Sequence, residues 1–110
     1  MTKDAQVEEG SGNVFADLGL PDAEELLSKA ALMLRIGEII KGHNLTQAQA
    51  AHVLGASQPV VSNLLNGRIS GFSLERLVRF LNALDRDVEI VVKRRPRSRL
   101  RAGVTVRVSG

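Results

Sequence analysis

The chain has 110 residues, a formal net charge of +3 at pH 7, 44% hydrophobic residues but only 3% aromatic residues, and no cysteine. This length fits one core of ordinary size, built mainly from Leu, Ile, Val and Ala, which favours small packed helices. The lack of cysteine excludes disulfides and thiolate metal sites. No apolar run approaches the roughly 20 residues of a membrane span, and MTKDAQVEEG does not resemble a secretory signal, so we expect a cytoplasmic protein with no membrane partner.

The charge is divided unevenly along the chain. Residues 1–27 contain seven acidic residues and one basic residue, a charge of −6, and the remainder contains 14 basic and five acidic residues, a charge of +9. A basic body favours a polyanionic partner, whereas the acidic end could lie on a basic protein surface. Each charge run could equally be a solvated tail.

The first predicted segment, residues 1–20, is an acidic flexible arm with one apolar stretch, VFADLGL. A helix follows, with Asp22 as its N-cap and Glu25 in the capping-box position. Apolar residues then recur at steps of three and four, which is typical of a helix, and the pattern ends near residues 42–44. The predicted apolar stripe consists of Leu26, Ala30, Met33, Leu34, Gly37 and Ile40.

Two short helices are predicted next. Thr46 and Gln49 have the spacing of a capping box at the start of the first one, which ends at Gly55. The second is capped by Ser57 and ends at residues 66–67, an Asn-Gly pair that readily takes left-handed backbone angles. A fourth helix, capped by Ser73 and ending at residues 85–86, carries on one face Leu74, Leu77, Val78, Leu81 and Leu84.

The periodicity then changes from about 3.6 to 2 over residues 87–93, DVEIVVK, which is typical of a strand. Residues 104–108 are a weaker strand candidate. A single strand leaves its backbone groups unpaired, so either the second candidate folds back as a hairpin, or the strand pairs with its twin in a homodimer through Val88, Ile90 and Val92, or both. The predicted organisation is an arm (1–20), a helical domain (21–86) and a C-terminal segment (87–110).

The stretch LTQAQAAHVLGASQPVVSNLLNG, residues 45–67, has the spacing of a helix-turn-helix. Small residues, Ala51 and Gly55, lie where two helices cross, and Gly55 can adopt a positive φ without steric cost. Val61 and Leu64 face inward on the later helix. The residues that then face outward are Gln58, Pro59, Ser62, Asn63 and Asn66.

Such an outward row can read base edges in a major groove. Amides bond adenine, hydroxyls serve several bases, and an apolar group can touch a thymine methyl. The predicted base contacts are Gln58, Pro59, Val60, Ser62 and Asn63. The predicted phosphate contacts, at the ends of the two helices, are Gln47, Ser57, Asn66 and Arg68.

At these residues the sequence resembles the Cro/C1-type (Xre family) helix-turn-helix proteins. Their pattern L-x-Q-x-x-x-A-x-x-x-G-x-S-Q-x-x-V-S-x-x-x-N-G is matched at Leu45, Gln47, Ala51, Gly55, Ser57, Gln58, Val61, Ser62, Asn66 and Gly67. The chain departs from it at Ala50, where a larger aliphatic residue is usual, and at Leu65, where Glu is frequent. The resemblance implies a mainly α, lambda-repressor-like bundle of four to five helices that binds an inverted-repeat operator in double-stranded DNA as a homodimer.

The flanking residues, NVFADLGLPDAEE and LVRFLNALDRDVEIVVK, resemble those of HigA-type antitoxins of type II toxin–antitoxin systems. This resemblance implies a repressor of its own operon that also neutralises a RelE-fold ribonuclease toxin. Such toxins are usually basic, which would suit an acidic N-terminal arm. A free-standing, phage-like Xre regulator without a toxin partner is the alternative.

Other chemistry has little support in the sequence. His43 and His52 have no further ligand at metal-site spacing, and no catalytic constellation or phosphate-binding loop is present. We therefore expect no metal, no cofactor and no enzymatic activity. The basic run KRRPRSRLR, residues 93–101, could contact DNA phosphates or form a solvated tail.

Overall fold

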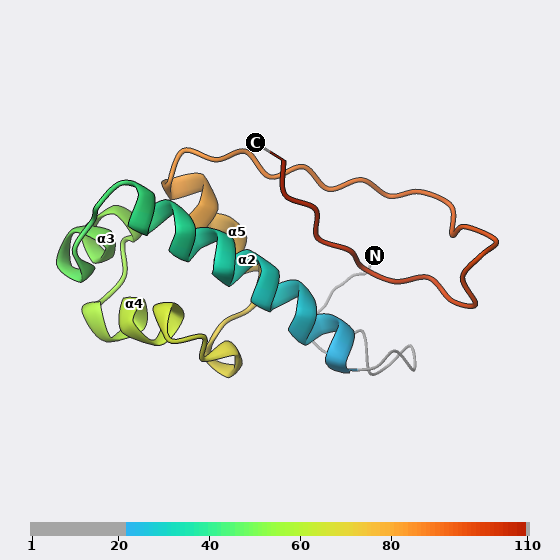
Figure 1. Ribbon diagram of the computed structural model, residues 1–110, viewed down its shortest axis with the longest axis horizontal. Helices are drawn as coiled ribbons and strands as arrows, with labels where there is room; N and C mark the ends of the chain where they lie inside the picture. Colours follow the sequence, from blue (N-terminus) through green and yellow to red (C-terminus); the bar gives the residue numbers. More distant parts are fainter. Residues whose placement is uncertain (1–21, 110) are drawn as a thin grey trace.

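The computed structural model describes residues 22–109, and for residues 22 and 23 it describes the backbone only. The predicted arm, residues 1–20, therefore lies outside the described residues. The described elements are α2 (Asp22–Gly42), α3 (Gln47–Leu54), α4 (Gln58–Leu65), the 3-10 helix η1 (Ile69–Gly71) and α5 (Leu74–Ala83). α2 runs diagonally through the molecule, and α3 and α4 lie at and below its C-terminal end (Figure 1). None of the helices between residues 22 and 109 combines the length and the hydrophobicity that a membrane span requires.

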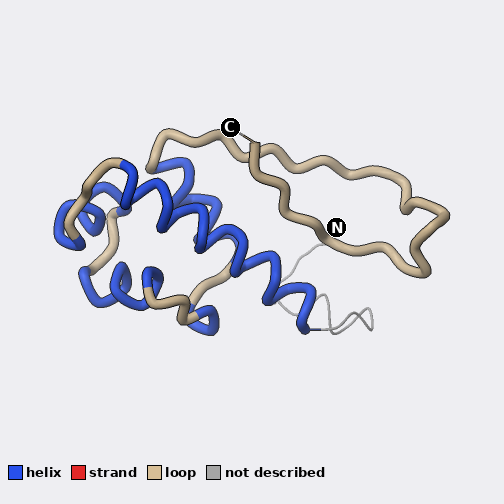
Figure 2. Tube along the Cα trace, in the orientation of Figure 1, coloured by secondary structure: helices blue, strands red, loops and turns tan. Residues whose placement is uncertain are grey.

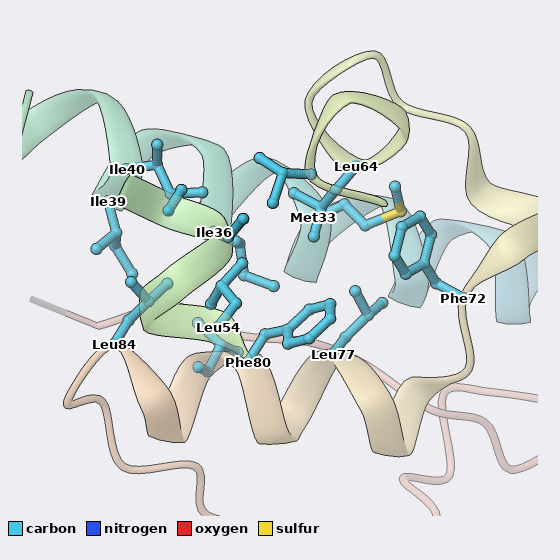
Figure 3. Packing of buried hydrophobic residues seen from close by; sticks show 14 residues of the cluster. Met33, Ile36, Ile39, Ile40, Leu54, Leu64, Phe72, Leu77, Phe80 and Leu84 are labelled. Atoms are coloured by element: carbon cyan, nitrogen blue, oxygen red, sulfur yellow. The ribbon is translucent and has the colours of Figure 1, made fainter. Parts of the chain in front are cut away.

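The core lies between α2 and the three later α-helices. α4 packs on α3 and α2, and α5 packs on α2 and α3. Figure 3 shows how α2 and α5 direct their apolar side chains toward each other, with α3 closing one end. The buried apolar residues are Met33, Ile36, Ile39, Ile40, Ala50, Ala51, Leu54, Val61, Leu64, Phe72, Leu77, Phe80, Leu81 and Leu84.

The buried face of α2 differs from the predicted stripe. Ile36 and Ile39 lie in the core, whereas Leu26 and Leu34 are 44% and 67% exposed. α2 carries apolar residues around much of its circumference, so that spacing alone fits more than one face. The face that is buried is the one on which α5 and α4 pack.

The buried face of α5 agrees better with the prediction than the buried face of α2 does. Leu77 and Leu81 are buried as expected, but Phe80 also lies in the core. Its ring meets that of Phe72 edge to face, with centroids 6.3 Å apart. The Arg76 guanidinium lies 5.4 Å from both ring centroids, within cation–π range.

The N-terminal ends of α3, α4 and α5 follow the predicted chemistry, whereas the predicted cap of the first helix, at Asp22, lies outside the residues whose side chains are described. The side chains that cap helix N-termini by accepting a backbone N–H are Thr46, Ser57 and Ser73. Just beyond each α-helix lies a residue with positive φ, whose following N–H reaches back to a carbonyl of the last turn, the pattern of a Schellman motif. These residues are Asn44, Gly55, Gly67 and Asp85.

The predicted C-terminal strand and intrachain hairpin are wrong for the single chain. No strand forms within residues 22–109, and the chain beyond α5 is loop in two long passes (Figure 2). Val104 and Val106 return beside the N-terminal half of α2, where the Val104 N–H donates to Glu24 Oε1 over 2.9 Å. Because the return pass lies against α2 and not against residues 87–93, the strand-like residues have no backbone partner among residues 22–109.

Candidate nucleic-acid interface

The interface is built on two helices whose starts are fixed by side-chain caps. Thr46 Oγ1 accepts from the Gln49 N–H over 3.1 Å, and Gln49 Oε1 accepts in return from the Thr46 N–H over 2.8 Å. The predicted capping box is therefore confirmed. At the start of α4, Ser57 Oγ accepts from the Val60 N–H over 3.4 Å, and Pro59 occupies the first turn, where a missing N–H costs no helical bond.

The corner between α3 and α4 is formed at Gly55. This residue has φ 66° and ψ 36°, the left-handed conformation. The N–H of the next residue, Ala56, donates to the Ala51 carbonyl over 2.9 Å and closes the end of α3. The turn thus reverses the chain sharply enough for α4 to pack back on α3.

The orientation of α4 is set by two buried residues. Val61 is fully buried and Leu64 is 2% exposed. A helix of eight residues is too short to be stable alone, so this burial both holds α4 in place and fixes its rotation. Gln58, Pro59 and Asn63 are consequently exposed on the opposite side.

Two of the predicted base-contact residues are less accessible than the others. Ser62 is half-buried, and Val60 is half-buried and packs against the core. Val60 therefore presents less apolar surface to a thymine methyl than a fully exposed valine would. The most exposed part of the face consists of Gln58, Pro59 and Asn63.

The C-terminal end of α4 holds the last two predicted contacts. Asn66 Nδ2 donates to Ser62 Oγ over 3.5 Å, which links the two side chains on the same face. Beyond it, Gly67 has φ 73°, and the Arg68 N–H donates to the Asn63 carbonyl over 3.0 Å. This closed turn places Arg68 immediately beside the outward face of α4, with its side chain exposed.

The N-terminal ends of α3 and α4 suit an anion. Gln47 is the first residue of α3 and is exposed, and Ser57 precedes α4 with its hydroxyl hydrogen still available to donate. Neither helix has an acidic residue in its first turn, so nothing there offsets the positive end of the helix dipole. Such helix starts attract phosphate groups.

The surrounding sequence is free of carboxylates. No acidic residue lies between Glu38 and Glu75, an interval that contains α3, α4 and η1. Lys41 and Arg68 supply positive charge in this interval. Lys41 lines the same groove as Gly67, between α2 and α4, and Glu38 lines the α2 side of that groove. Sequence reasoning missed Lys41 because no local pattern connects the end of α2 with the end of α4.

A metal-dependent site is not indicated by the described residues, since among them no group of three or more His, Cys, Asp or Glu side chains could hold an ion. His43 and His52 are both exposed. The exposed residues of α3, α4 and the turn after α4 can offer hydrogen bonds, apolar contact and positive charge to a partner.

The comparisons with known proteins agree with this geometry. A family model described as a helix-turn-helix domain matches residues 14–93. The chain belongs to this helix-turn-helix family. A solved structure described, provisionally, as an XRE family transcriptional regulator aligns with 81% of this chain and 100% of its own, with 48% sequence identity and a TM-score of 0.77. No curated protein matches the chain.

These matches confirm the predicted helix-turn-helix fold of Xre type. The departures of this helix-turn-helix domain from the family pattern have structural explanations. Ala50 is fully buried, so its small side chain fits a tight crossing. Leu65 is 39% exposed and its Cδ2 faces Gly37, 3.7 Å from the position a Cβ would take there. The finer resemblance to HigA-type antitoxins stays a prediction.

Proposed function

We propose that the chain is a sequence-specific DNA-binding transcriptional repressor whose α4 enters the major groove. The observation that carries this proposal is the rotation of α4. Burial of Val61 and Leu64 turns the amides of Gln58 and Asn63 outward, on helices that contain no acidic residue. The similarity to a protein described as an XRE family transcriptional regulator supports the same reading.

The exposed residues divide into two roles. Those on the outward face of α4 read base edges, through bidentate amides, a hydroxyl and apolar contact; they are Gln58, Pro59, Val60, Ser62 and Asn63. Those at the helix ends hold phosphates and set the register of the protein on the duplex; they are Gln47, Ser57, Asn66 and Arg68.

The repressor acts as a homodimer on an inverted repeat. Two recognition helices related by a two-fold axis enter successive major grooves about 34 Å apart. The predicted dimer strand residues support this assembly by their exposure: Val88 is half-buried, whereas Ile90 and Val92 are 80% and 93% exposed. Apolar side chains this exposed on a strand-like segment favour an intermolecular partner.

The roles are tested by comparing Asn63→Ala with Arg68→Ala on DNA from upstream of the chain's own gene, using a footprint to locate the operator and fluorescence anisotropy to measure affinity. Asn63→Ala should cost about 1–3 kcal/mol on the operator and relax the preference at one base pair. Arg68→Ala should weaken binding to all sequences and lower the salt slope by about 1.

A matched control is Arg79→Ala, which removes the same charge from the exposed face of α5. It should leave operator affinity unchanged. An equal loss for Asn63→Ala on operator and on random DNA would contradict a base-reading role for that residue. A footprint absent at every concentration would contradict the repressor itself.

A second role as the antitoxin of a type II pair is favoured by the charge distribution. Residues 1–27 carry a charge of −6, which is complementary to the basic surface of a RelE-fold ribonuclease. The protein would then repress its own operon and neutralise the toxin. The alternative, a free-standing Xre regulator, requires no such partner.

The two readings are separated by the gene neighbourhood and by a pull-down. The antitoxin reading expects a short, basic open reading frame beside this gene, and co-purification of its product with the full chain. Deletion of residues 1–25 should abolish that complex while leaving operator binding intact. The acidic arm is not the toxin interface if the truncated chain still co-purifies with the toxin.

A further inference from the structure

Residues 87–95 form a stretch whose side chains are typical of a strand. Among the described residues, no backbone–backbone hydrogen bond involves this stretch. Its apolar side chains are exposed along most of its length, with Val91 68% and Val92 93% exposed. An uncovered strand edge of this kind is a template for another chain.

The two ends of this stretch are fixed by the chain itself. On one side, Asp85 has φ 64° and the Arg86 N–H donates to the Leu81 carbonyl, which completes the end of α5. On the other side, Pro96 has no N–H to give to a ladder, and its carbonyl accepts from the Arg99 N–H in a turn. The segment available for pairing is therefore 87–95, and its middle residue is Val91.

The charged side chains on the two sides of Val91 have opposite signs. Asp87 and Glu89 precede Val91, and Lys93 and Arg95 follow it at the same distances. If two copies pair antiparallel with Val91 opposite Val91, Asp87 of each copy lies opposite Arg95 of the other, and Glu89 lies opposite Lys93. Opposite charges in directly facing positions stabilise an antiparallel pair.

Each neighbouring register keeps only one of the two pairings. With Ile90 at the centre, Asp87 faces Lys93, but Glu89 faces Val91 and Arg95 has no partner within the segment. With Val92 at the centre, Glu89 faces Arg95, but Lys93 faces Val91 and Asp87 has no partner within the segment. Only the register centred on Val91 gives both acidic residues a basic partner.

We propose that two copies of the chain pair antiparallel through residues 87–95, with the two-fold axis at Val91. The proposal deepens the homodimer of the proposed function and rests on it. In the single chain the Arg95 guanidinium donates to the carbonyl oxygens of Pro96 and Arg99. A carboxylate of the second copy is a stronger acceptor than these carbonyls.

The two paired segments would have one apolar face and one charged face. Val88 packs against the core, whereas Ile90 and Val92, which share its face in an extended segment, are 80% and 93% exposed in the single chain. In the Val91 register, Ile90 of one copy lies opposite Val92 of the other, which gives a continuous apolar face across the two copies. The charged residues alternate onto the solvent side, and Arg94 falls at the edge of the apolar face, where its stem can cover Val88 of the second copy.

The register is tested by cysteine scanning, because the chain has no cysteine of its own. Residues directly opposite in an antiparallel pair lie about 4.5–5.5 Å apart between Cα atoms, within disulfide range, whereas diagonal neighbours lie about 7–8 Å apart. Under mild oxidation of the full chain, Val91→Cys should form disulfide-linked dimers at least about tenfold faster than Ile90→Cys or Val92→Cys. Fastest cross-linking at position 90 or 92, or none at all three, would overturn the proposal.

A charge exchange tests the ion pairs without DNA. Glu89→Lys and Lys93→Glu each place like charges opposite each other and should weaken the dimer about tenfold in sedimentation equilibrium. An equimolar mixture of the two variants should recover wild-type affinity, because the heterodimer restores both pairs. Glu75→Lys, on the exposed face of α5, is the control and should have no effect.

An unchanged dimer constant for both single variants would overturn the proposed interface while leaving the repressor function open. Loss of operator binding by a chain that still cross-links at position 91 would instead contradict the repressor and leave the interface standing.

Discussion

At Gly55, in the turn between α3 and α4, we predict a graded loss of stability for a series of substitutions. This residue has φ 66°, and a Cβ added there would meet nothing within 4 Å. The expected penalty is therefore conformational, about 1–2 kcal/mol for an ordinary L residue in the left-handed region. Asn enters this region more readily than Ala, and a β-branched residue enters it least readily. The free energy of unfolding should thus fall least for Gly55→Asn, more for Gly55→Ala and most for Gly55→Val.

The measurement is urea denaturation followed by circular dichroism, with a thermal scan as a second readout. One kcal/mol corresponds to about 4–8 °C in Tm for a domain of this size. Gly71→Ala is the matched control, since Gly71 also has open space at its Cβ position but no positive φ, and it should stay within about 0.5 kcal/mol of the parent. A loss that follows side-chain volume, with Asn worse than Ala, would refute the conformational explanation, and so would an equal loss in the control.

Three further changes test other parts of the fold by urea denaturation. Leu77→Ala removes a fully buried side chain and should cost about 2–5 kcal/mol, whereas Leu27→Ala, at a position 71% exposed, should change stability by less than about 0.5 kcal/mol. Thr46→Ala should cost about 1 kcal/mol through loss of the capping box, and Thr46→Ser should retain most of it. Arg76→Gln should cost about 0.5–1 kcal/mol by removing the cation from two aromatic rings; an equal loss for Arg79→Gln, on the exposed face of α5, would contradict that contribution.

The ends of the short helices could be predicted from the sequence because their signals are local. Thr46 and Ser57 cap the helices by accepting a hydrogen bond from an N–H three residues on, and Gly55 and Gly67 end them in the left-handed conformation, which glycine adopts without steric cost. Each of these interactions is complete within one turn of chain. Tertiary packing therefore cannot easily change where the helices begin and end.

The face of a long helix could not be predicted in the same way. α2 has apolar residues at consecutive positions, including Leu32, Met33 and Leu34, so that a step of three or four fits several faces. The outcome depends on Phe72 and Phe80, which come from elsewhere in the chain and pack on the side of Met33 and Ile36. On α4, by contrast, the inward residues Val61 and Leu64 are separated by polar ones, which is why the candidate interface could be predicted.

The C-terminal segment shows that an alternating pattern predicts the side chains of a strand but not the partner with which the strand pairs. Residues 87–93 have the side chains of a strand, but a strand is stable only when its backbone groups bond to a neighbour. Within the described residues the return pass lies along α2 and provides no such neighbour. The opposite charges on either side of Val91 match when a second copy runs antiparallel to the first, which the alternation alone does not reveal. The same sequence therefore gives a loop in the single chain, and we propose that it forms a strand when two copies pair.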